Sequence, residues 1–301
     1  MSWTIELKKN VSLHEGREAT LPKESITPEI EAKLKLAVRA APIMAGTAIQ
    51  LIQRYAVVRP SEKMSPLHEE VQNTLTKYFL LDPNVGRYGS IVNRIVTVYK
   101  AMQKGLLGGY PIYAYAEPRK PETFRHAYVN VNKSANLALS DYFADPEERH
   151  WDWDKFITMA KNHAGNPDLA LADEIHLNYE WFKESTVDME MLALTIVHEA
   201  SHKWAFTTDV CYKSSTMSKT LSPESLADAV RQGFQPVIER QNEPKGPMYL
   251  MAAPGKKVVN YPTQFNVRQN EAWITNADSY AWAARRLWKR IEIFATYSRY
   301  G

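Results

Sequence analysis

The sequence is poor in cysteine and contains no long apolar run. Its 301 residues include one cysteine, Cys211, so no disulfide can form within the chain, which suits a reducing compartment. No apolar run approaches the ~20 residues that span a bilayer, and segment 1–10 lacks the basic start and apolar core of a secretory signal. We therefore expect no membrane span and no signal peptide, and a protein that is cytoplasmic or exported by a signal-independent secretion system.

Charge of one sign is not concentrated anywhere in the chain. The 37 Lys and Arg residues nearly balance the 34 Asp and Glu residues, and no basic block or aromatic-basic repeat occurs. This composition argues against a nucleic-acid partner. Short pairs such as Arg285-Arg286 are expected to be solvated surface. Internal repeats and low-complexity segments are also absent, so one domain is expected over 29–301, preceded by an arm or edge strands at 1–28.

The apolar pattern changes period along the chain. Helical spacing appears at about 27–56, 66–80 and 89–106, and again at about 223–240 and 272–301. Alternation typical of strands appears at about 110–116, 127–132 and 175–182. This order predicts an α+β fold with an N-terminal helical half, a small mixed sheet, an internal helix at about 185–205 and a C-terminal helix.

One motif carries chemistry. H-E-A-S-H, an instance of H-E-x-x-H, lies in an apolar helical stretch and comprises His198, Glu199 and His202. Residues four apart share one helix face, so both imidazoles can bind one Zn²⁺. Glu199 lies beside that metal position, where it can take a proton from the attacking water and pass it to a leaving amine. By chance the motif arises on the order of once in a hundred such sequences.

The start of this helix and the third metal ligand are less defined. Ser185 or Thr186 is the expected N-cap, because Ser185-x-x-Asp188 resembles a capping box. A catalytic zinc site needs a third protein ligand and an open position. The carboxylate candidates are Asp209, Asp278 and Glu271, of which Asp209 follows His202 most closely.

The segments around the motif resemble a known family. T-T-D-V-C-Y follows H-E-A-S-H at 207–212, and N-A-D-S-Y-A-W occurs at 276–282. Together they resemble the aspzincins, the deuterolysin and peptidyl-lysine metalloendopeptidase family of zinc proteases. The resemblance implies a zincin-like metalloprotease fold with Zn²⁺ as cofactor, held by His198, His202 and Asp209. It also implies that Glu199 is the general base and that Tyr212 stabilises the oxyanion.

The resemblance extends to the substrate pocket only in part. It places Asp278 and Tyr280 near the substrate, so both are expected to be substrate-binding residues. Ala281 stands where the lysine-specific branch has a glutamate, and lysine specificity is therefore not implied. About sixty residues separate Tyr212 from Asn276, more than in compact family members. The excess is an insertion at about 213–270, expected to be a lid over the cleft or a surface subdomain.

These patterns predict a zinc metalloendopeptidase acting on a polypeptide substrate that pairs with the strand at 175–182. One alternative is a zinc amidase acting on cell-wall peptides. Another is a non-catalytic zinc-stabilised binding protein, against which Glu199 argues because a structural site needs no base. A leaderless protease is hazardous to its producer, so control by an inhibitor or immunity partner is implied, as for an effector toxin.

Overall fold

The computed structural model describes part of the chain, including most of the predicted helices. The described residues are 8–9, 26–79, 81–84, 86, 88–108, 110, 112–115, 126–129, 175–205, 207, 237–240, 248–251, 274 and 276–300. Only the backbone is described at 8–9, 237–240, 248–251 and 291–300. Asp209, Tyr212 and Glu271 lie outside these residues.

A long central helix, α1 (Pro28–Tyr55), has the bounds that the sequence predicts. Pro28 suits the first helical position, and the Thr27 side chain accepts a hydrogen bond from the Ile30 amide at 3.4 Å. Among the described helices, α1 is the one long and apolar enough to cross a membrane by length and composition. In the structure, 72% of its most apolar 18-residue window is buried. It is a core helix in this fold.

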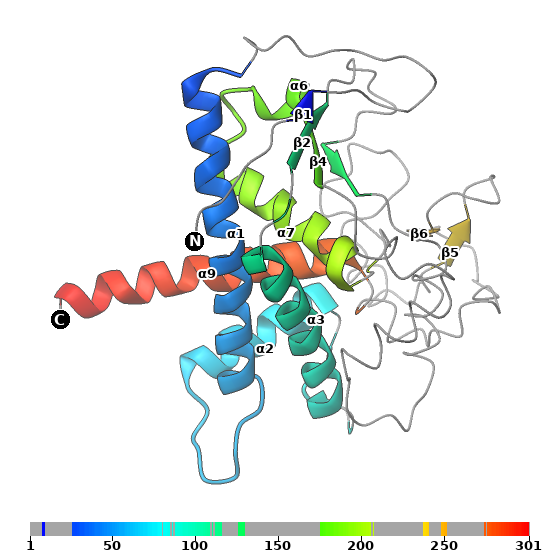
Figure 1. The fold of residues 1–301 in the computed structure, drawn as a ribbon. Helices are drawn as coiled ribbons and strands as arrows, with labels where there is room; N and C mark the ends of the chain where they lie inside the picture. The colour runs from blue at the N-terminus through cyan, green and yellow to red at the C-terminus, as the bar shows by residue number, and fades with distance from the viewer. Residues whose placement is uncertain are drawn as a thin grey trace.

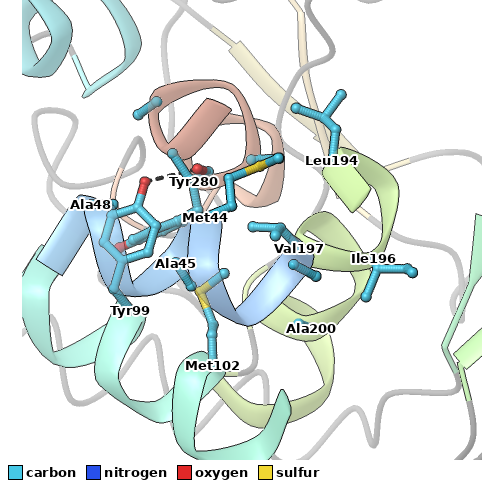
Figure 2. Packing of buried hydrophobic residues seen from close by; sticks show 14 of the residues in the cluster. Met44, Ala45, Ala48, Tyr99, Met102, Leu194, Ile196, Val197, Ala200 and Tyr280 are labelled. Atoms are coloured by element: carbon cyan, nitrogen blue, oxygen red, sulfur yellow. Dashed lines mark hydrogen bonds between the residues drawn. The ribbon is translucent and has the colours of Figure 1, made fainter. Parts of the chain in front are cut away.

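Four further helices pack around α1, as Figure 1 shows. They are α2 (Pro66–Phe79), α3 (Tyr88–Gly108), α7 (Met189–Ala205) and α9 (Ala277–Tyr300). The helix α7, which carries the H-E-x-x-H motif, packs against α1, α3 and α9 and also contacts β3 and β4. Residues from the helices α1, α3, α7 and α9 meet in one apolar cluster (Figure 2).

A small mixed sheet lies beside this helical core. Its strands are β1 (Lys8–Lys9), β2 (Ile112–Tyr115), β3 (Ala127–Tyr128) and β4 (Ile175–Asn178), arranged in the order β1-β2-β4-β3. The strand β3 runs antiparallel to β4, whereas the other pairs are parallel. The described part of the chain is therefore α+β, and the expectation of a small mixed sheet is confirmed.

The segment 175–182 differs from its prediction in two ways. It is a strand only to Asn178, whose side chain accepts a hydrogen bond from the Glu180 amide at 3.1 Å and begins the short helix α6 (Tyr179–Phe182). Both edges of β4 are already occupied, by β2 and β3. The predicted pairing of a substrate along 175–182 is therefore wrong, because β2 and β3 pair with the strand and the chain is helical from Tyr179.

The predicted insertion is described only as a hairpin. Its strands β5 (Val237–Arg240) and β6 (Met248–Met251) pair antiparallel, with Val237 opposite Met251. The helix predicted over 223–240 is therefore wrong at its C-terminal end. The run Val237-Ile238 has strong strand propensity, and a partner strand begins within ten residues of the end of β5. Both features favour a strand over a helix here. The rest of 213–270 lies outside the described residues.

Two carboxylates hold α9 against its neighbours. Each pairs with two cations four residues apart on α9: Glu190 of α7 with Arg285 and Lys289, and Glu70 of α2 with Arg286 and Arg290. We call these the Glu190 clamp and the Glu70 clamp. The expectation that Arg285-Arg286 is merely solvated surface is wrong, because both guanidinium groups bridge helices.

Candidate metal centre

The helix α7 is capped by an aspartate, Asp188, and not by the residue that the sequence pattern predicts. The Asp188 carboxylate accepts a hydrogen bond from the Met191 amide at 2.8 Å, and the Asp188 carbonyl accepts from the Leu192 amide. Asp188 is therefore the N-cap, and the expectation of Ser185 or Thr186 is wrong. All three are capping residue types, so the sequence alone does not separate them.

The turn before α7 is tied to α1 by one ammonium group. Lys33 Nζ donates to the carbonyl oxygens of Phe182 at 2.6 Å, Glu184 at 3.2 Å and Val187 at 2.8 Å. All three protons of the ammonium are thus used. Partial burial lowers the pKa of Lys33, an effect that the nearby Asp188 carboxylate opposes. This contact fixes where α7 leaves the α6 turn.

The two motif histidines point their Nε2 atoms at each other. These atoms are 3.1 Å apart, and the rings stand nearly perpendicular, at 81°. Both side chains are buried, with 8% of His198 and 7% of His202 exposed. The four-residue spacing on α7 produces this convergence, as the sequence predicts.

The other nitrogen of His198 faces α9. Its Nδ1 lies 2.8 Å from Oδ1 of Asp278, and both groups are buried. A carboxylate is a preferred acceptor for the second ring N–H of a metal-binding histidine, so the contact matches His198 with its proton on Nδ1. Asp278 lies in the first turn of α9, where the helix dipole favours a negative charge.

The corresponding nitrogen of His202 faces the chain just after α7. His202 Nδ1 donates to the Thr207 carbonyl oxygen at 2.7 Å. Thr207 is itself held by Ser201, whose hydroxyl lies 2.6 Å from the Thr207 hydroxyl and also donates to the His198 carbonyl at 2.7 Å. Sequence reasoning missed these roles for Ser201 and Thr207. The signal available was the pair of hydroxyl residues at the end of the motif helix.

In this arrangement the Nε2 atoms of both histidines meet at one point. A cation at this point would accept a lone pair from each ring. Two nitrogens bound to one tetrahedral zinc at ~2.05 Å are ~3.3 Å apart, close to the observed 3.1 Å. Each ring also has the acceptor on its second nitrogen that metal-binding histidines require. The two histidines therefore have the spacing and the acceptors expected of two zinc ligands.

The third ligand is not among the described residues. Within the part of the chain that the structure describes, no group of three or more His, Cys, Asp or Glu side chains could hold a metal. Asp278 lies behind His198, on Nδ1 and away from the point where the Nε2 atoms meet. It is therefore badly placed as a ligand, and Asp209 stays a prediction outside the described residues. Glu199 is buried on α7, with 4% exposed.

Tyr280 occupies a different setting from Asp278. Its side chain is fully buried, its hydroxyl donates to the Ile274 carbonyl at 2.7 Å, and its ring packs edge-on against Phe79 and Tyr99. Burial raises the pKa of Tyr280 well above its usual range. This position makes Tyr280 part of the core rather than of a substrate-binding surface. The substrate contact predicted for Asp278 stays a prediction.

No family model, curated protein or solved structure matches the chain. The resemblance to the aspzincins therefore depends on the motif residues alone.

Proposed function

We propose that the protein is a zinc-dependent metalloendopeptidase with an aspzincin-like site on a zincin-like fold. The observation that carries this proposal is the pair of buried Nε2 atoms 3.1 Å apart, each on a ring whose Nδ1 is engaged by an acceptor. Two histidines that bind one metal converge in this way, with an acceptor behind each ring. The H-E-x-x-H motif places the carboxylate of Glu199 on the same helix.

The roles follow from chemistry that these residue types perform. His198 and His202 hold the metal through Nε2, and Asp278 and Thr207 keep the protons on Nδ1. When bound, zinc supplies Lewis-acid polarisation of the scissile carbonyl and makes water more acidic. Glu199 takes a proton from the attacking water and gives it to the leaving amine. By resemblance, Asp209 completes the ligand set and Tyr212 stabilises the oxyanion.

The first prediction tests the metal and the base together. Purified protein is expected to contain one zinc per chain by elemental analysis and to cleave an unfolded protein substrate, with activity lost on chelation and restored by zinc. Glu199→Gln keeps the side-chain shape and removes the proton carrier, so it should keep zinc and lose activity by about 10²–10⁴-fold. Glu190→Gln is the matched control on α7 and should keep both.

Three results would count against the proposal in different ways. Protein that neither contains nor takes up zinc would remove the metal site. Wild-type turnover by Glu199→Gln would remove its role as base. Zinc binding without cleavage of polypeptides would favour the two alternatives, a zinc amidase or a non-catalytic zinc protein. Cleavage of cell-wall peptides would then identify the amidase.

A further inference from the structure

We propose that Asp278 is a positioning residue for His198, so that docking of α9 onto α7 is what prepares the metal site. The inference rests on the proposed function but concerns a residue outside the H-E-x-x-H motif. Asp278 comes from the C-terminal helix, 80 residues from His198 in sequence, and the 2.8 Å contact with Nδ1 joins the two elements.

The contact selects one tautomer of His198. A neutral imidazole carries one proton, on either nitrogen, and the hydrogen bond at one nitrogen decides which form is present. With Asp278 accepting from Nδ1, the lone pair is on Nε2, which faces His202. Without that acceptor, the proton can move to Nε2 and occupy the point where a metal would bind. Asp278 thus keeps the ligand atom available.

The first turn of α9 is held firmly enough for this role. The Tyr99 hydroxyl of α3 donates to the Tyr280 carbonyl at 2.7 Å, two residues after Asp278 (Figure 2). The side-chain amide of Asn276 donates to the Ser279 hydroxyl at 2.9 Å, and both side chains are fully buried. The carboxylate therefore approaches His198 from an anchored backbone, and its position is fixed by the core of α1, α3, α7 and α9.

A reciprocal coupling follows. If docked α9 favours the metal-binding form of His198, then metal binding favours docked α9 by the same free energy. Zinc should accordingly protect the first turn of α9 from amide hydrogen exchange. His202 is backed by the Thr207 carbonyl, just after α7, so this coupling acts through His198.

The test uses the full chain with Asp278→Ala and Asp278→Asn. Imidazole ¹⁵N chemical shifts of the metal-free proteins report the tautomer of His198. Zinc affinity is measured separately by competition with a chromophoric chelator. Glu190→Gln is the matched control, because it also removes one carboxylate from the contact between α7 and α9 but touches neither histidine, and the apolar core contacts of α9 keep the helix docked.

Wild type and Glu190→Gln are expected to show His198 with its proton on Nδ1. Asp278→Ala should show a large fraction of the Nε2-protonated form and bind zinc about 10–100-fold more weakly. Asp278→Asn retains the volume and one acceptor oxygen, so it should lie between the two, with about tenfold weaker binding. It also serves as the test variant if the alanine form does not fold.

The tautomer separates this proposal from the proposed function. An alanine variant whose His198 stays protonated on Nδ1, or an asparagine variant that binds zinc as wild type does, overturns the positioning role even if the protein is a zinc protease. A changed tautomer in Asp278→Ala supports the positioning role even if wild-type protein fails to bind zinc, in which case the proposed function alone is lost.

Discussion

At the scale of single residues, a glycine sets how closely α3 approaches the motif helix. A Cβ on Gly105 would lie 2.1 Å from Cδ2 of the Trp204 indole, a distance that side chains do not tolerate. Trp204 is two residues after His202, and its ring packs edge-on against Tyr110 at 5.4 Å. The absence of a side chain at Gly105 therefore decides where the end of α7 rests.

This contact predicts whether alanine at position 105 raises or lowers the free energy of unfolding. Replacing a helical glycine by alanine ordinarily stabilises by about 0.5–1 kcal/mol. Gly105→Ala should instead destabilise, by about 1–3 kcal/mol, because the indole must move. Gly89→Ala is the control in the same helix, with nothing within 4 Å of the added Cβ, and should be neutral or slightly stabilising. Urea unfolding measures both, and a stabilised Gly105→Ala would contradict the close approach.

The sequence predicts only those contacts of the candidate site that join residues close together in the chain. The pairing of His198 with His202 follows from four-residue spacing on one helix, and the structure brings the two rings together. The contact of His198 with Asp278 depends on how two helices pack, which no local pattern encodes. The N-cap prediction was wrong for a different reason, because Ser185, Thr186 and Asp188 can all cap a helix and the structure uses Asp188.

At the scale of elements, helix existence was predictable but the ends of strands were not. The bounds of α1 follow from Thr27, Pro28 and the apolar period. In 175–182 the alternation of apolar residues continues past Asn178. The Asn178 side chain nevertheless caps a helix, so the chain continues as α6 and not as a strand. Capping chemistry thus outweighs a pattern that by itself favours a longer strand.

The junction between α1 and α7 gives an element-scale prediction. Lys33→Met keeps the aliphatic stem and removes a charged donor to three carbonyl groups, so it should lower the free energy of unfolding by about 1–2 kcal/mol. Lys35→Met, which removes an exposed cation paired with Glu31, is the control and should change it by less than about 0.5 kcal/mol. Equal effects of the two variants in urea unfolding would show that the carbonyl contacts contribute nothing specific.

At the scale of the whole molecule, ion pairs and core contacts cooperate to seat α9. Its apolar face meets α1 and α7, while the Glu70 and Glu190 clamps fix its rotation against α2 and α7. The acidic partners are largely shielded, with 15% of the Glu70 side chain and 18% of the Glu190 side chain exposed. Their pairs are therefore more than solvated surface contacts.

The clamps predict a salt-dependent stability. The double variant Glu70→Gln, Glu190→Gln should lower the free energy of unfolding by about 1–2 kcal/mol at low ionic strength, since each carboxylate loses two cations. The difference from wild type should shrink in 1 M salt, where the screening length is about 3 Å. A difference that does not change with salt would mean that packing, and not charge, carries the effect.

The distance in sequence between α7 and α9 has a consequence for biosynthesis. His198 leaves the ribosome 80 residues before Asp278, an interval on the order of ten seconds at about 5–20 residues per second. The Glu70 clamp joins residues that are 216 positions apart, and the Tyr99 contact joins residues 181 apart. During translation the motif helix is thus present without the carboxylate that sets its first histidine. In a nascent chain His198 is therefore not yet in contact with Asp278. The contact can form only after α9 has emerged from the ribosome and docked.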